Sequence, residues 1–198
     1  MDKQKSETMK KINKMDIKQL CQSLERISSM ELSEFFGGGI HYYVDSRGNI
    51  ETYSGDQYLG YYIYCGENKL EIDGPLDYAS QDGKTFIMNG SYAIFTFLAD
   101  NTSVEYGYFC KTDSEHPLEN SKDGFVVTSG DEREGHLGYP VDSDYNTQIH
   151  SHPRSDRSNG SGPSDGDKEH KEEQQNEEGN TITIFGVYNP HDHKIKYY

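Results

Sequence analysis

The sequence predicts a domain of mixed α and β structure, and three observations carry this prediction. Short segments rich in aromatic and β-branched residues, such as TITIFGVY, are separated by turn residues and predict strands. Apolar residues at helical spacing predict a helix over 91–101, whose buried face would be formed by Ile94, Phe95, Phe97 and Leu98. The charged segment 167–178 has the composition of a second helix. Because hydrophobic residues make up only 32% of the 198 residues, we expect a core that is small for this length.

The N-terminal residues 1–33 are predicted to form a polar tail and an amphipathic helix. The first 15 residues are polar and rich in lysine. In the segment 16–29 apolar residues recur at helical spacing, and Asp16 is suited to cap the helix. Three consecutive glycines, at 37–39, separate this region from the rest of the chain.

Strands are expected in most of the remaining chain. The segment IHYYVDSRGNIETY predicts a strand, a turn at Arg47-Gly48-Asn49 and a second strand, and YLGYYIYCG and KLEI predict two more. After the helix over 91–101, the segments SVEYGYFCK, GFVVT and TQIHSH predict three further strands. At the C-terminus, KIKYY is expected to pair with TITIFGVY through an NPHDH turn.

Charge, cysteine content and hydropathy exclude several classes of protein. The net charge of -15 argues against a nucleic-acid partner, because nucleic-acid binding requires a basic surface. The three widely spaced cysteines predict neither a disulfide framework nor a cysteine-ligated zinc site. No signal peptide and no membrane span is recognisable, so we expect a soluble protein, either cytoplasmic or exported as an effector without a cleavable signal peptide.

Candidate metal ligands lie in the C-terminal part of the chain. His150 and His152 end a predicted strand, and residues two apart on a strand point to the same face. Both imidazoles can therefore reach one metal ion, and Pro153 then directs the chain out of the strand. A loop over 153–163 leads to Ser164, a suitable N-cap that places Asp167 in the first turn of the next helix.

These three ligands predict a catalytic Zn²⁺ site. Two imidazoles and one carboxylate leave the fourth tetrahedral position open for water, whose pKa zinc lowers. A nearby carboxylate can take the proton of that water and pass it to a leaving amine. Glu105 is our candidate for this acid/base, because it is expected on a separate strand among apolar and aromatic residues. Ser164 is the candidate donor of a hydrogen bond to the developing oxyanion.

Each of these signals is weak when it is taken alone. A second H-x-H pair, His191 and His193, lies in a predicted hairpin turn and is expected to be an exposed turn without a metal. A Ser-x-x-Asp segment by itself is only a helix cap, and the chain has 34 acidic residues. The prediction therefore rests on order: an acid on a strand, paired histidines at a strand end, a loop, and a capped helix that carries an aspartate.

At these residues the sequence resembles the JAB/JAMM (MPN-type) zinc metallopeptidase family. The motif of that family is a glutamate on an early strand, then H-x-H, a spacer and S-x-x-D, which here correspond to Glu105, 150–152 and 164–167. The spacer over 153–163 is longer than is usual in the family. Asp165 and Asp156 are therefore alternative ligands, although the S-x-x-D register favours Asp167.

A narrower resemblance covers residues 85–198. The segments FTFLADNTSVEYGYF, QIHSHP and PSDGD are similar to the JAB-like toxin group of bacterial polymorphic toxins. The resemblance implies an α/β fold of the cytidine-deaminase-like kind, a curved mixed β-sheet flanked by helices. It implies a JAB/MPN-like domain over 34–198, with a β-rich lead-in over 34–88 and a catalytic core over 89–198.

The same resemblance implies an enzyme, a JAMM-type zinc metallopeptidase or isopeptidase that acts as a toxin or effector. Its substrate would be a protein or peptide, with a ubiquitin-like protein as one candidate, and an immunity protein is a candidate partner. Two alternatives remain: a non-catalytic protein-binding module of the same fold, and a different zinc hydrolase. A zinc deaminase ranks lowest, because its P-C-x-x-C signature is absent from the sequence.

Overall fold

The computed structural model describes residues 39–55, 60–81, 83–113, 118–128, 130, 144–153, 162–176 and 180–198. The helix expected over 16–29 lies outside these residues. The strands are β1 (Gly39–Val44), β2 (Ile50–Gly55), β3 (Tyr61–Cys65), β4 (Asn68–Ile72), β5 (Tyr78–Gln81), β6 (Lys84–Gly90), β7 (Gly107–Cys110), β8 (Gly124–Thr128), β9 (Thr147–Ser151), β10 (Ile184–Asn189) and β11 (Lys194–Tyr197). The helical elements are α4 (Tyr92–Asn101), the 3-10 helix η1 (Leu118–Asn120) and α5 (Asp165–Asn176).

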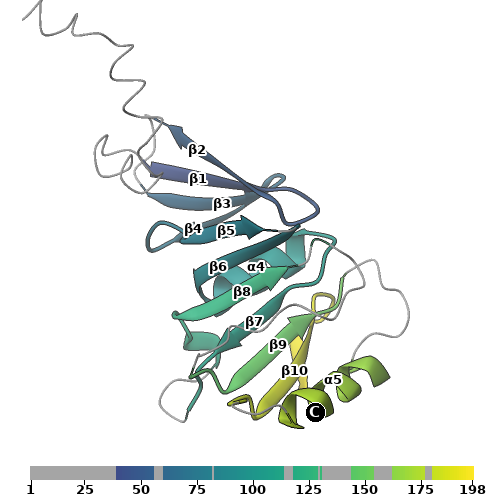
Figure 1. Cartoon of the computed structure of the whole chain (residues 1–198). Helices are drawn as coiled ribbons and strands as arrows, with labels where there is room; N and C mark the ends of the chain where they lie inside the picture. The colour runs from purple at the N-terminus through teal and green to yellow at the C-terminus, as the bar shows by residue number, and fades with distance from the viewer. Residues whose placement is uncertain are drawn as a thin grey trace, which may run out of the picture.

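Among the described residues, the strands form two mixed sheets (Figure 1). Sheet A has the order β2-β1-β3-β4, and its one parallel pair is β1 with β3. Sheet B has the order β11-β10-β9-β7-β8-β6-β5, and its one parallel pair is β9 with β10. The prediction of a mixed α/β fold is confirmed, although the strands are divided between two sheets.

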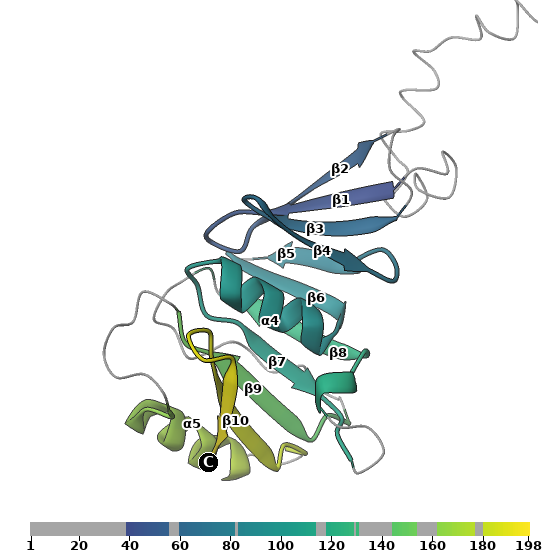
Figure 2. The ribbon, with the colours of Figure 1, turned by 180° about the vertical axis from the view of Figure 1, so that it is seen from behind.

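The two helices lie on opposite faces of sheet B, as neighbouring residues of β7 show. Tyr108 points to one face, where its ring stacks on Phe95 of α4 with 5.5 Å between the centroids. The next residue, Phe109, points to the other face and packs with Phe185. On that second face Lys171 of α5 lies over the ring of Phe185, at 5.6 Å from its centroid. Helix α4 lies behind the strands in Figure 1 and in front of them in Figure 2.

Helix α4 confirms the sequence prediction over 91–101 and shows why this segment is helical. Ser91 is the N-cap, and its hydroxyl oxygen accepts a hydrogen bond from the Ile94 N–H at 3.2 Å. Ile94, Phe95 and Leu98 are buried as expected, whereas Phe97 is only partly buried. The expected apolar face is therefore correct except at one position.

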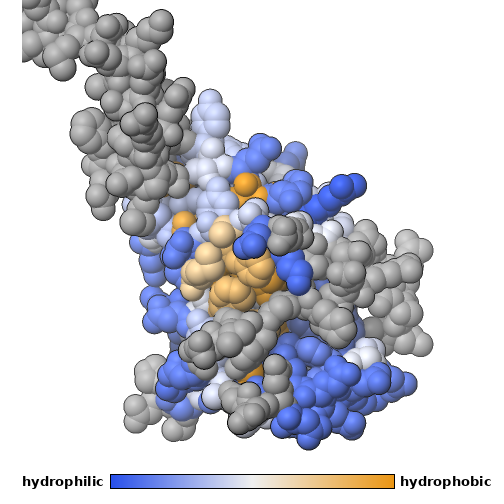
Figure 3. Space-filling view, in the orientation of Figure 1, coloured by the Kyte–Doolittle hydropathy of each residue, from blue (hydrophilic) through white to orange (hydrophobic). Residues whose placement is uncertain are grey.

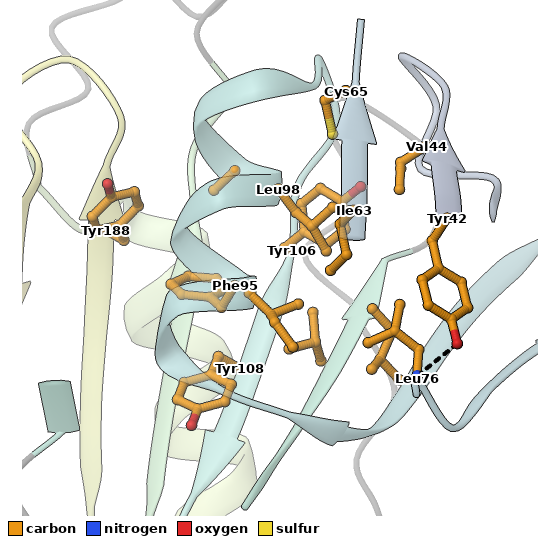
Figure 4. Packing of buried hydrophobic residues seen from close by; sticks show 14 of the residues in the cluster. Tyr42, Val44, Ile63, Cys65, Leu76, Phe95, Leu98, Tyr106, Tyr108 and Tyr188 are labelled. Atoms are coloured by element: carbon orange, nitrogen blue, oxygen red, sulfur yellow. Dashed lines mark hydrogen bonds between the residues drawn. The ribbon is translucent and has the colours of Figure 1, made fainter. Parts of the chain in front are cut away.

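The main core lies between α4, sheet B and the inner face of sheet A (Figure 4). Ile63 and Tyr42 come from sheet A, and Leu98 and Phe95 come from α4. Tyr42 is fully buried, but its hydroxyl accepts a hydrogen bond from the Leu76 N–H at 2.9 Å. Burial raises the pKa of Tyr42 to about 12, so the phenol is neutral and does not carry a charge into the core.

Replacing Phe95 with alanine is expected to lower the free energy of unfolding by about 3–5 kcal/mol. Phe95 has no exposed surface and packs against Tyr108 and Tyr188, so its removal leaves a cavity that rigid neighbours cannot fill. Tyr53→Ala is the matched control, because Tyr53 is 68% exposed and should cost less than about 1 kcal/mol. Urea denaturation of the two variants measures this difference, and equal losses would contradict the packing described for α4.

Several element boundaries differ from the sequence prediction. The sequence did not indicate β5 and β6, which form one edge of sheet B. Strand β7 begins at Gly107, so Glu105 lies in the segment that leads into the strand. Helix α5 begins at Asp165, directly after Ser164, the expected N-cap, and so two residues before the charged segment 167–178. Its largely exposed side chains give the hydrophilic surface seen in Figure 3, as expected for a solvated helix.

Within the described ranges no helix is long and apolar enough to cross a membrane.

Candidate metal centre

The H-x-H segment lies at the end of a central, buried strand. Strand β9 lies between β7 and β10, and all five of its residues are buried. His150 is its penultimate residue, and His152 follows directly after its last residue, Ser151. The His152 N–H donates a hydrogen bond to the Tyr188 carbonyl oxygen at 3.3 Å. This bond keeps the backbone of His152 beside β10, although His152 lies after the last residue of β9. The two imidazoles therefore share one face of the sheet, as predicted.

Helix α5 begins with a reciprocal cap that fixes the third candidate ligand. The Ser164 hydroxyl oxygen accepts a hydrogen bond from the Asp167 N–H at 3.1 Å. In return, the Asp167 carboxylate accepts a short hydrogen bond from the Ser164 N–H. This arrangement is a capping box with an aspartate in the third helical position. The N-cap role expected for Ser164 is confirmed, and it holds the Asp167 carboxylate at the helix start.

The three expected ligand atoms converge. His150 Nε2 lies 3.1 Å from Asp167 Oδ1, and His152 Nε2 lies 3.4 Å from Asp167 Oδ2. The two Nε2 atoms are 3.3 Å apart, and the three ligand atoms all lie within 4.8 Å of one another. Each of the three side chains is at most 13% exposed. A strand end and a helix start thus present two nitrogens and a carboxylate oxygen to one small volume.

Electrostatics keep the Asp167 carboxylate charged. Burial by itself would raise its pKa, but hydrogen bonds from His150 and His152 hold the pKa well below the usual value for aspartate. The Ser164 N–H acts in the same direction. A charged carboxylate beside two imidazoles has the composition of a divalent-cation site, since metal ligands must be deprotonated.

The long spacer left two alternative ligands open, and the structure separates one of them from the site. Asp165 points into solvent and forms an ion pair with Lys168, with 3.0 Å between Oδ1 and Nζ. The other alternative, Asp156, lies outside the described residues. Asp167 is therefore the aspartate that meets the two histidines among the residues that the structure describes.

The backbone of Glu105 lies close to the H-x-H segment. Gly107 pairs with His150 in the antiparallel register of β7 and β9. The Ser151 N–H donates to the Tyr106 carbonyl oxygen at 2.8 Å, and the Tyr106 N–H donates to the Ser151 hydroxyl at 3.0 Å. Glu105 directly precedes Tyr106, so its backbone lies one residue from these two hydrogen bonds.

Gly107 is a feature of the site that sequence reasoning did not identify. It is buried and stands opposite His150, so no side chain of β7 lies beside the imidazole at this position. The glycine alone gave no signal in the sequence, because its importance depends on the pairing of β7 with β9.

The second H-x-H pair lies in the turn between β10 and β11, and His191 and His193 are exposed there as expected. His193 has a contact that the sequence did not indicate. Its Nδ1 lies 3.2 Å from an oxygen of Asp100, at the end of α4, and 3.0 Å from the Tyr188 hydroxyl. The Tyr188 hydroxyl also donates to Asp100 at 3.0 Å. The contact of His193 with Asp100 therefore holds this turn against the end of α4. The turn is separate from the three converging ligands.

Ser164→Ala is expected to lower the free energy of unfolding by about 1 kcal/mol and to weaken zinc binding as well. The substitution removes the acceptor for the Asp167 N–H and with it the cap that orients the carboxylate. Ser91→Ala, at the equivalent position of α4, is the matched control that should lose similar stability and keep its zinc affinity. Calorimetric titration with zinc distinguishes the two, and equal zinc affinities would show that the cap does not position Asp167.

Comparison with known families agrees with this geometry. The fold is α/β, and a buried cluster of two histidines and one aspartate stands at the end of a central strand, as in a hydrolase-like domain with a candidate metal site. Residues 88–172 match the family described as JAB-like toxin 1. No curated protein and no solved structure matches the chain.

Proposed function

We propose that this protein is a zinc-dependent hydrolase of peptide or isopeptide bonds that acts as a toxin or effector domain. One observation carries the proposal: the Nε2 atoms of His150 and His152 and the carboxylate of Asp167 converge within 4.8 Å inside a JAB-like toxin domain. Two nitrogens and one oxygen are the ligand set of catalytic zinc sites, which keep a fourth position for water or substrate.

The chemistry of the donors fits zinc. His150 and His152 offer borderline nitrogen ligands, and the charged Asp167 balances part of the charge of a divalent ion. The two cysteines that the structure describes do not contribute to the cluster. Burial raises the pKa of Cys65 to about 12 and that of Cys110 to about 11, so both thiols are protonated and poor metal ligands.

Zinc held by these residues would lower the pKa of a bound water and polarise the scissile carbonyl. Glu105 would take the proton of the water and deliver it to the leaving nitrogen, because its backbone lies beside the H-x-H segment. Ser164 accepts the Asp167 N–H through its oxygen, which leaves its own hydroxyl proton available. That proton would be donated to the oxyanion that develops during attack.

The substrate we propose is a protein of a competitor or host cell, and a ubiquitin-like protein is one candidate. The match to a toxin family supports a protein target and suggests an immunity protein as a partner.

Inducible expression in bacteria, combined with cleavage assays, tests the proposal. Wild-type protein is expected to arrest growth and to hydrolyse members of a panel of fluorogenic peptide and lysine-isopeptide substrates. A zinc chelator should abolish hydrolysis, and added zinc should restore it. If Glu105→Gln arrests growth as strongly as wild type and neither protein cleaves any substrate, the non-catalytic binding module becomes the better account.

A further inference from the structure

A groove of about 570 Å³ lies away from the metal centre, between the end of β4, the start of α4 and η1. These three elements lie on the same side of the molecule in Figure 2. None of the residues that line the groove belongs to the cluster of His150, His152 and Asp167. A ligand in this groove would therefore leave the metal centre accessible.

The walls of the groove are held in place by hydrogen bonds. The Asn89 side chain donates to the Pro75 carbonyl oxygen at 2.8 Å and accepts from the Asp77 N–H at 2.8 Å, which fixes the turn after β4. The Tyr92 N–H donates to the Ser121 carbonyl oxygen at 3.1 Å, which fixes the segment after η1 against α4. A groove with fixed walls binds a ligand with little loss of its own conformational freedom.

The floor of the groove is apolar. Leu76 and Ile94 are buried members of the main core that also line the groove. Leu70 and Ile72 line it as well and are only partly buried. Aliphatic side chains of a ligand could cover this floor and remove apolar surface from water.

The rim of the groove is acidic. Glu71 and Asp73 line one side, and Glu119 and Asp123 line the other. Lys122 is the one basic residue in the lining that the structure describes, and its Nζ lies 3.2 Å from Asp73 Oδ2. Both side chains of this ion pair are more than 70% exposed, so the pair contributes little stability and does not neutralise the rim.

The backbone N–H groups at the start of α4 do not make the groove a binding site for anions. The Tyr92 N–H is bonded to Ser121, and the Ile94 and Phe95 N–H groups are bonded to Ser91. Few free N–H groups therefore remain at this helix start to attract a negative ligand. The carboxylates of the rim therefore make the electrostatic potential in the groove negative.

We propose that this groove is a docking site for a basic segment of a partner polypeptide, in which lysine or arginine alternates with aliphatic residues. The aliphatic side chains would cover Leu70 and Ile72, and the basic side chains would meet the carboxylates of Glu71 and Glu119. Charge complementarity selects this occupant over an acidic one. The site is independent of zinc and of hydrolysis.

Fluorescence polarisation with a labelled Lys-Leu-Lys-Leu-Lys peptide and the full chain tests the proposal. The double substitution Glu71→Gln with Glu119→Gln is expected to weaken binding at least about tenfold. Glu169→Gln with Glu172→Gln is the matched control, because these exposed residues of α5 give the same change in net charge far from the groove. The control should bind within about twofold of wild type, since it leaves the local rim intact.

Thermal denaturation confirms that each variant folds, and His150→Ala, which lacks the metal site, should bind the peptide as wild type does. Equal weakening in the two double variants would show attraction by net charge alone and would overturn the proposal. Absence of peptide binding to the wild-type protein would overturn it as well. A labelled Glu-Leu-Glu-Leu-Glu peptide that binds as tightly would contradict the assigned charge of the occupant.

Discussion

Alanine in place of His150 or of Asp167 is expected to leave the purified protein without zinc, whereas wild type retains about one zinc per chain. Each substitution removes one of three protein ligands, and the remaining two cannot hold the ion against buffer and water. Loss of Asp167 also removes the charged group between the imidazoles. Elemental analysis after zinc reconstitution and desalting measures the metal content directly.

His193→Ala is the matched control for this experiment. His193 belongs to the other H-x-H pair and contacts Asp100 and Tyr188, so its loss should leave the zinc content unchanged. Zinc that persists in both His150→Ala and Asp167→Ala would refute the assignment of the metal site. Zinc lost in His193→Ala alone would move the site to the turn between β10 and β11.

Glu105→Gln is expected to keep the zinc and to lower the rate of hydrolysis by about 10²–10⁴-fold. Glutamine has nearly the same size as glutamate but cannot take a proton from water at neutral pH. Steady-state kinetics on the substrate found in the cleavage assay should show the loss in kcat, because proton transfer takes place in the transition state.

Glu172→Gln is the control for this loss, because Glu172 is exposed on α5 and is not part of the site. It should retain the wild-type rate. A Glu105→Gln variant that hydrolyses the substrate as fast as wild type would show that another group, or water alone, transfers the proton.

The parts of the site that the sequence could predict are those encoded by short local signals. An H-x-H pair at a strand end places two imidazoles on one face, whatever the rest of the fold does. A Ser-x-x-Asp segment at a helix start fixes its own geometry, as the reciprocal hydrogen bonds of Ser164 and Asp167 show. The choice of Asp167 over Asp165 was also predictable, because only the third helical position can complete the capping box.

Other parts depend on pairing between distant segments and could not be read from the sequence. Gly107 stands opposite His150 only because β7 and β9 are neighbours in sheet B. The contact of His193 with Asp100 joins the last turn of the chain to the end of α4. Strands β5 and β6 gave no clear signal, since YASQ is mostly polar and exposed and KTFIMNG mixes polar and apolar residues.

The groove was equally hidden from sequence reasoning. Its floor and rim come from β4, α4 and the segment after η1, and no local pattern brings Glu71 near Glu119. The excess of acidic residues in the chain was visible, but its concentration around an apolar floor was not.

Anomalous diffraction at the zinc edge from crystals of the zinc-loaded protein tests the central claim most directly. The account predicts one peak within bonding distance of His150 Nε2, His152 Nε2 and a carboxylate oxygen of Asp167, with no sulfur ligand. A zinc peak elsewhere in the protein, or a ligand set that lacks either histidine, would contradict it.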